Sequence, residues 1–406
     1  MKPIRLAVIF DQQIRTGGGY QQALNAALLT KELPKELAQV VFFTTLNENA
    51  VTLAAYGVQA EIIHLSFFSK VRTYLRMKIV YPRFLKVIKK FWRYPVLEKK
   101  LIKHRIDLVY FLSPSKLAQS FEELNYITTV WDLCHRDDPE FPEVRWNRQF
   151  EGRDKNYQAI LPRATAIFVD SESGKKNVAH RYGVDLGRIH VMPFQPAEAI
   201  RREVSSILRK DVNINEKYQL NSPYVFYPAQ FWAHKNHIYL LEGLISLEKQ
   251  YGLSVGAIFC GGDPGNRAYV EGYVNKLGLK DRVRFTGFVS NEEIIDLYRE
   301  SIALVMPSYF GPTNLPPLEA FQLSIPVLYP DKEGLRDQVG DAGLLIDLED
   351  PSSMAVHLKN LIEDKNLRER LILAGHERLV HFDTFDRVGI LKKVIQGFRW
   401  RRMSWE

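Results

Sequence analysis

The stretch that decides the fold is IALVMPSYFGPTNLPPLEAFQLSIPVLYP, residues 302–330. Its two ends, IALVMPS (302–308) and IPVLYP (325–330), are short apolar runs typical of buried strands. Between them, Pro316 and Pro317 favour a helix start, because the first helical positions need no N–H donor. A strand, a crossover helix and a second strand make up the unit from which parallel sheets are built.

The same alternation runs along most of the 406 residues. Further strands are expected at 4–10, 40–44, 106–112, 126–131, 165–170 and 188–194, and then at 224–229, 255–261 and 283–288. Helical spacing is present at 20–31, 236–250 and 291–299. We therefore expect an α/β protein of two Rossmann-like halves that face a central cleft.

A single hydrophobic core rarely serves more than about 300 residues, so this length favours two domains. A polar, helix-poor stretch at 205–222 separates the two series of strands and places the boundary near 197–220. The predicted domains are 1–200 and 201–385, followed by a C-terminal helix, 386–406, that packs toward the first domain.

The composition is that of a globular protein, with 46% hydrophobic and 25% charged residues. No apolar run approaches the roughly 18–20 residues of a membrane helix, and the start MKPIRLAVIF does not have the pattern of a signal peptide. Two cysteines, Cys134 and Cys260, are too few for a disulfide framework. These features predict a cytoplasmic location.

The net charge of +8 is concentrated in one place. Residues 70–105 carry thirteen Lys or Arg and one acid, Glu98, so the rest of the chain is slightly acidic. Aromatic and aliphatic residues alternate with these bases, which is typical of a helix lying on anionic lipid. Lys86, Lys89, Lys90 and Arg93 are the candidate membrane or acceptor surface; a solvated charged face is the alternative. A nucleic-acid module is disfavoured, because no recognised motif accompanies the bases.

In the second half, candidate binding residues follow the strands. Lys235, with His234 before it, opens a helix and suits a phosphate; a solvated lysine is the alternative. Gln230, five residues before Lys235, is a further candidate donor-binding residue. Backbone amides at Thr313, Asn314 and Leu315, before the Pro-Pro helix start, are expected to be free for an anion. Glu319 is a candidate acceptor for ribose hydroxyls; its other reading is a favourable charge in a helix first turn.

In the first half, Gly17, Gly18 and Gly19 precede a helix and allow close backbone approach to a ligand; a flexible turn is the alternative. Asp132 and His135 follow a strand and form the nearest acid/base or hydrogen-bonding pair there, although a lone histidine is usually structural. The histidines form no metal-binding motif, and we expect no metal.

The sequence resembles family 4 retaining glycosyltransferases of GT-B fold, among the group 1 glycosyltransferases. The motifs that carry this resemblance are Pro-Ser (307–308), LPPLEAF (315–321), IPVL (325–328), the lead-in 277–298, the following stretch 334–351, HKN (234–236), VDSESGKKNV (169–178) and RIHVMPF (188–194). They cover about residues 125–380. The N-terminal third matches only through the glycine loop.

The sequence departs from the family pattern at three positions. Gly311 replaces the first of two glutamates spaced eight apart, Gln230 replaces an arginine, and Trp131 replaces the histidine before Asp132. These differences concern the identity of the donor and the detail of its site more than the fold.

The resemblance implies a retaining, metal-independent hexosyltransferase without a cofactor. It would move a hexose or deoxyhexose from a UDP-sugar or a GDP-mannose-like donor to a glycan or lipid-linked acceptor, in bacterial surface polysaccharide or lipopolysaccharide assembly. Asp132, His135, Lys235 and Glu319 would be catalytic, and peripheral association with the inner membrane face is expected. A nucleotide-sugar epimerase and a non-catalytic scaffold or basic binding protein remain alternatives.

Overall fold

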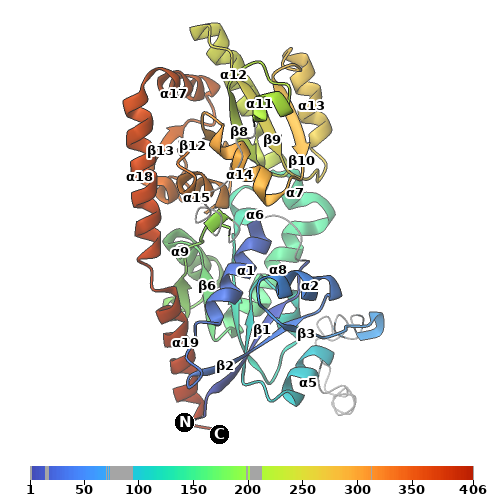
Figure 1. The fold of residues 1–406 in the computed structure, drawn as a ribbon. Helices are drawn as coiled ribbons and strands as arrows, with labels where there is room; N and C mark the ends of the chain where they lie inside the picture. The colour runs from blue at the N-terminus through green and yellow to red at the C-terminus, as the bar shows by residue number, and fades with distance from the viewer. Residues whose placement is uncertain are drawn as a thin grey trace. The chain divides into compact units, whose positions relative to one another are not determined.

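The computed structural model describes residues 2–13, 18–69, 71, 73, 95–197, 200–201, 213–311 and 313–405. These residues form two compact units, each built around one parallel sheet (Figure 1). The first unit comprises residues 1–133, 151–192 and 386–406, and the second comprises 134–150 and 193–385. The segment 134–150, which precedes the expected boundary by about fifty residues, therefore packs with the second unit.

The first unit has a seven-stranded sheet in the order β3-β2-β1-β4-β5-β6-β7. Its strands are β1 (Ile4–Phe10), β2 (Ala38–Thr44), β3 (Ala60–Ile62), β4 (Leu108–Phe111), β5 (Asn125–Thr129), β6 (Ala166–Val169) and β7 (Ile189–Val191). Its main helices are α1 (Gly18–Thr30), α2 (Asn47–Ala55), α5 (Val96–Lys103), α8 (Gln149–Ile160), α9 (Glu172–Tyr182) and α19 (Arg387–Arg402).

Strand β1 is buried on both faces, as a central parallel strand must be. Leu6 and Val8 belong to the hydrophobic cluster on one face, and Ala7 and Ile9 to the cluster on the other. Helix α19 joins the first of these clusters through the apolar residues Leu391, Val394, Ile395 and Phe398. The expected return of the C-terminal helix to the first domain is thus present.

The second unit has a six-stranded sheet in the order β10-β9-β8-β11-β12-β13. Its strands are β8 (Tyr224–Pro228), β9 (Gly256–Cys260), β10 (Val283–Gly287), β11 (Leu304–Val305), β12 (Val327–Pro330) and β13 (Gly343–Ile346). Its helices include α6 (Cys134–Asp137), α7 (Pro142–Arg145), α11 (Ile214–Lys217), α12 (His237–Tyr251), α13 (Arg267–Lys276), α14 (Asn291–Arg299), α15 (Leu315–Gln322), α16 (Arg336–Val339), α17 (Pro351–Glu363) and α18 (Lys365–Asp383), with the 3-10 turn η6 (Ala233–Lys235).

The two parallel α/β sheets confirm the predicted fold class. The edge strands β3 and β13 were not expected from the sequence, because runs of only three residues (AEI) and four residues (GLLI) are too short to show a clear strand pattern. Among the described residues, no helix is both long enough and apolar enough to cross a membrane.

Glu98, the single acid of the basic stretch, is fully buried at the start of α5. One oxygen of its carboxylate accepts backbone N–H bonds from Glu122, Glu123 and Leu124 at 2.9, 2.8 and 3.0 Å. Its side chain therefore holds the loop before β5 and lies in the interior of the first unit.

Truncation of Ile395 tests the packing of α19. Ile395 is fully buried, so Ile395→Ala should lower the free energy of unfolding by about 2–5 kcal/mol. The neighbouring exposed Gln396→Ala should change it by less than about 0.5 kcal/mol. Chemical denaturation of the full chain measures both, and equal stabilities for the two variants would contradict the packing described.

Candidate functional site

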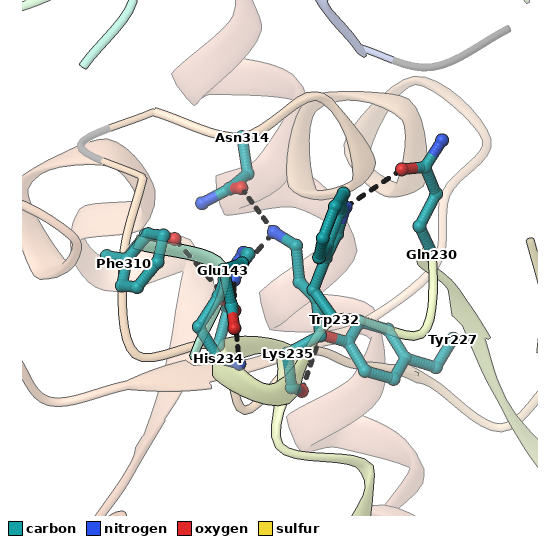
Figure 2. Close-up of polar contacts among 9 residues, drawn as sticks. Glu143, Tyr227, Gln230, Trp232, His234, Lys235, Phe310 and Asn314 are labelled. Atoms are coloured by element: carbon teal, nitrogen blue, oxygen red, sulfur yellow. Dashed lines mark hydrogen bonds and ion pairs between the residues drawn. The ribbon is translucent and has the colours of Figure 1, made fainter. Parts of the chain in front are cut away.

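Lys235 lies where β8 and β11 reach the carboxyl edge of the second sheet, the edge at which ligands bind in open α/β folds. Its ammonium Nζ donates to Ser308 Oγ and to Asn314 Oδ1, each at 3.3 Å (Figure 2). The structure therefore brings Lys235 together with the loop that precedes α15, as the sequence predicted.

The side chain of Asn314 is oriented by its other contacts. Its Nδ2 donates to Gly311 O at 3.0 Å and to the Tyr329 hydroxyl at 2.6 Å, so the remaining Oδ1 is turned to Lys235. The backbone N–H of Asn314 donates to Gln338 Oε1 at 2.9 Å. This amide is not free, contrary to the prediction, because a glutamine distant in sequence satisfies it.

Thr313 and Leu315 adjoin Asn314 in sequence, and Gln230 follows β8. Leu315 begins α15 and is buried, and Thr313 lies immediately before Asn314. Gln230, after β8, accepts a bond from the indole Nε1 of Trp232 at 2.9 Å, so its side-chain oxygen is already engaged. Gly311 has a φ of +108°, a backbone conformation that glycine adopts readily and other residues rarely do.

His234 is held by a carboxylate that the sequence analysis did not identify. Its backbone N–H donates to Glu143 Oε1 at 2.9 Å, and its ring Nδ1 contacts the same oxygen. Burial raises the pKa of Glu143, but the bonds from the His234 ring and backbone outweigh it, so this pKa is lowered. Glu143 is therefore ionised at neutral pH. No sequence signal points to it, because it lies 91 residues before His234.

Glu319 is buried, with 7% of its surface exposed. Its Oε2 accepts the Tyr298 hydroxyl at 3.0 Å, and the backbone N–H of Ala197 also bonds to the carboxylate. Burial raises the pKa of this carboxyl to about 7 despite these two bonds. The predicted role of Glu319 in ribose binding stays a prediction.

In the first unit, Asp132 pairs with Arg153, and its carbonyl accepts the Tyr157 hydroxyl at 3.3 Å. His135 belongs to the second unit, where it is fully buried and packs edge-on against Phe150. The burial of His135 accords with its structural reading.

The glycine loop is described only in part. Gly17 lies outside the described residues, and Gly18 begins α1. A Cβ at Gly19 would lie 2.7 Å from Cζ3 of Trp131, so a glycine is needed there for the close approach of an aromatic ring. Lys86, Lys89, Lys90 and Arg93 also lie outside the described residues.

A second polar group that the sequence analysis missed lies at the carboxyl edge of the first sheet. Asp11 follows β1 and accepts Ser113 Oγ at 2.9 Å and Ser115 Oγ at a shorter distance. Burial raises the pKa of Asp11, although both hydroxyls act against it. Its position directly after a strand was the available signal. Within the described ranges, no three His, Cys, Asp or Glu side chains are grouped to hold a metal ion.

The raised pKa of Glu319 predicts a pH effect on stability. The folded state binds a proton more tightly than the unfolded state, whose carboxyl titrates near 4.5, so this residue's contribution is fully present below pH 4.5 and is lost as the pH rises toward 7. Glu319→Gln should therefore gain stability relative to the parent protein between pH 5 and pH 8. Melting temperatures measured in parallel test this; a constant difference across that range would contradict it.

Residues 209–378 match the family model described as "Glycosyl transferases group 1". D-inositol 3-phosphate glycosyltransferase from Corynebacterium glutamicum (strain R) is 25% identical over 264 residues, which cover 62% of this chain and 59% of that protein. O-antigen chain mannosyltransferase B from Escherichia coli is 24% identical over 277 residues, covering 65% of this chain and 67% of that protein. The chain thus spans less than two thirds of the length of the inositol phosphate enzyme.

Solved structures resemble the whole chain. Anabaena Alr3699/HepE in complex with UDP has a TM-score of 0.67 at 14% identity, covering 100% of both chains. WaaG, a glycosyltransferase involved in lipopolysaccharide biosynthesis, has a TM-score of 0.67 at 15% identity, covering 97% of this chain and 99% of that one. At these identities the likeness concerns the fold. The chain has the two Rossmann-like domains of GT-B glycosyltransferases, and its residues 209–378 match the group 1 family of these enzymes.

Proposed function

We propose that the protein is a glycosyltransferase that transfers a hexose or deoxyhexose from a nucleotide diphosphate sugar to a glycan or lipid-linked acceptor. The observation that carries the proposal is the placement of Lys235, whose ammonium meets Ser308 and Asn314 beside the start of α15. The family match covers this segment, and the relatives named above are a D-inositol 3-phosphate glycosyltransferase and an O-antigen chain mannosyltransferase.

In this mechanism, Lys235 would stabilise the negative charge that develops on the departing diphosphate. A fixed cation in a water-poor site supplies that stabilisation without a metal ion, and the proposed reaction is metal-independent. Asn314 would keep the ammonium in place, because its amide group is itself tied to Gly311 and Tyr329. We also propose retention of configuration at the transferred sugar.

Glu319 would accept the ribose hydroxyls of the donor. Both oxygens of the carboxyl are acceptors only when it is ionised, since protonation turns one of them into a donor; a pKa of about 7 places this change within the physiological range. The acceptor would bind mainly to the first unit, near Asp132 and the glycine loop.

A role in surface polysaccharide or lipopolysaccharide assembly is part of the proposal. The binding of UDP by HepE, which shares the fold, supports a nucleotide diphosphate sugar as the donor. The involvement of WaaG in lipopolysaccharide biosynthesis supports the class of pathway.

A panel of UDP-glucose, GDP-mannose and dTDP-glucose tests the donor site by thermal shift. A ligand present at 100 times its Kd adds about 2.7 kcal/mol of stability, so one or more members should raise the melting temperature clearly. Lys235→Ala and Glu319→Ala should each reduce that shift and lower sugar transfer at least tenfold, whereas Lys249→Ala, exposed at the end of α12, should not. Parent-like binding and transfer in both site variants would refute the site assignment.

We further propose peripheral association with the inner face of an anionic membrane. The described residues that flank the basic stretch support it, since Phe67 and Phe68 are 75% and 82% exposed immediately before Lys70. Exposed aromatic rings next to clustered bases suit the interface between lipid headgroups and acyl chains.

Replacing Lys86, Lys89, Lys90 and Arg93 with alanine should weaken binding to vesicles that contain phosphatidylglycerol, because each base near an anionic surface contributes about 1 kcal/mol. The matched control removes the same charge from exposed positions of the second unit: Lys249, Lys280, Lys365 and Arg370. Co-sedimentation measures both. If both variants lose vesicle binding equally, the loss reflects net charge alone. If the variant at 86, 89, 90 and 93 loses no binding, these residues are not a membrane surface.

A further inference from the structure

The segment that includes α6 and α7 is attached to the loop around Lys235 at three points. Asp138 Oδ1 accepts from Lys332 Nζ at 2.7 Å, and the same ammonium donates to the carbonyl of Tyr309 at 2.7 Å. The ring of Phe141 packs against the rings of Tyr309 and Phe310, with centroids 5.2 and 5.4 Å apart. The third contact is that of Glu143 with His234.

This third contact is the most enclosed. The side chains of Glu143 and His234 are 9% and 10% exposed, and the His234 ring stacks on Phe310 with centroids 3.8 Å apart and planes at 16° (Figure 2). The second carboxylate oxygen of Glu143 is buried and has no hydrogen-bond partner among the described residues. The hydrogen bonding of this carboxylate is therefore directed at His234.

His234 and Phe310 each adjoin a part of the candidate donor site. His234 precedes Lys235 in the same 3-10 turn, and its carbonyl accepts the backbone N–H of Tyr309 at 2.9 Å. The carbonyl of Phe310 accepts Ser308 Oγ at 2.9 Å, and Ser308 in turn accepts from Lys235. A shift of the His234 ring would therefore move both the ammonium and the loop that holds it.

We infer that Glu143 is a positioning residue for the donor diphosphate. By bonding to the backbone and ring of His234, it holds Ser308, Phe310 and Lys235 in one arrangement. This inference rests on the proposed function and extends it to a segment, 138–143, that the chain contributes from well before the family match. Glu143 thus adds to the donor site a carboxylate that no sequence motif around Lys235 predicts.

The sign of the effect on binding separates positioning from simple electrostatics. A buried carboxylate near Lys235 repels an anionic ligand, so its removal would tighten diphosphate binding if charge alone mattered. If Glu143 acts by positioning, its removal weakens binding, because preorganised contacts are lost. The two mechanisms thus predict opposite changes in Kd.

The experiment is isothermal titration of UDP, GDP and dTDP into the full chain and its variants. Glu143→Ala should weaken binding of whichever nucleotide the parent protein takes by about tenfold, equivalent to about 1.4 kcal/mol. Glu143→Gln, which keeps an oxygen acceptor for the His234 N–H, should lose less. Glu140→Ala, an exposed glutamate three residues earlier, is the matched control and should bind as the parent does.

A double-mutant cycle with His234→Ala distinguishes positioning from a general loss of stability. Glu143→Ala in the His234→Ala background should cause no further loss of affinity, because the side chain that Glu143 orients is already gone. Additive losses, or parent-like or tighter binding by Glu143→Ala, would overturn the inference. Should Glu143→Ala not fold, Glu143→Gln takes its place in the cycle with the same criteria. Absence of UDP, GDP and dTDP binding by the parent protein would refute the proposed function itself, and the inference with it.

Discussion

The bond between Lys235 and Asn314 joins two segments 79 residues apart in sequence, and the candidate site depends on it. The carboxyl ends of parallel strands meet at one edge of a sheet, so the residues after β8 and after β11 are necessarily close. Once there, the ammonium is satisfied in part by neutral oxygens of Ser308 and Asn314. The proposed donor site rests on the placement of this ammonium beside the start of α15.

A segment from another part of the chain contacts the residues around this ammonium. Glu143 meets His234, and Asp138 meets Lys332, so these two acids of segment 138–143 face basic side chains of the second unit. Phe141 fills the space between these two pairs by packing on Tyr309 and Phe310. Gly311, where the family pattern has a glutamate, directly follows Phe310, whose ring packs on Phe141 and stacks on His234.

Much of the fold could be predicted from the sequence, since local patterns carry the information. The apolar run 4–10 became β1 without change, and the helical spacing at 291–299 became α14. Both are long enough for periodicity to be clear. The membership of segment 134–150 in the second unit could not be predicted, because its contacts are with residues about 90 to 190 positions later and leave no local pattern.

The candidate site, too, could be predicted only in part. Position after a strand identified Lys235 and Asn314, but the pairing of the Asn314 amide with Gln338 was outside the reach of sequence reasoning. Burial, likewise, is a property of the assembled unit. Histidine and glutamate are both common in binding sites, and residue type alone did not show that His135 is buried in a core or that burial raises the pKa of Glu319.

The sequence by itself determined the parallel α/β architecture, the division into two Rossmann-like domains and the position of the candidate donor residues along the chain. These follow from periodicity, from glycine and proline placement and from the order of strands, all of which are local. Only the tertiary structure decided which side chains meet, which carboxyls are buried and that Glu143 reaches His234. Hydrogen bonding and desolvation depend on distances of a few ångströms between residues far apart in the chain, and no local pattern specifies those distances.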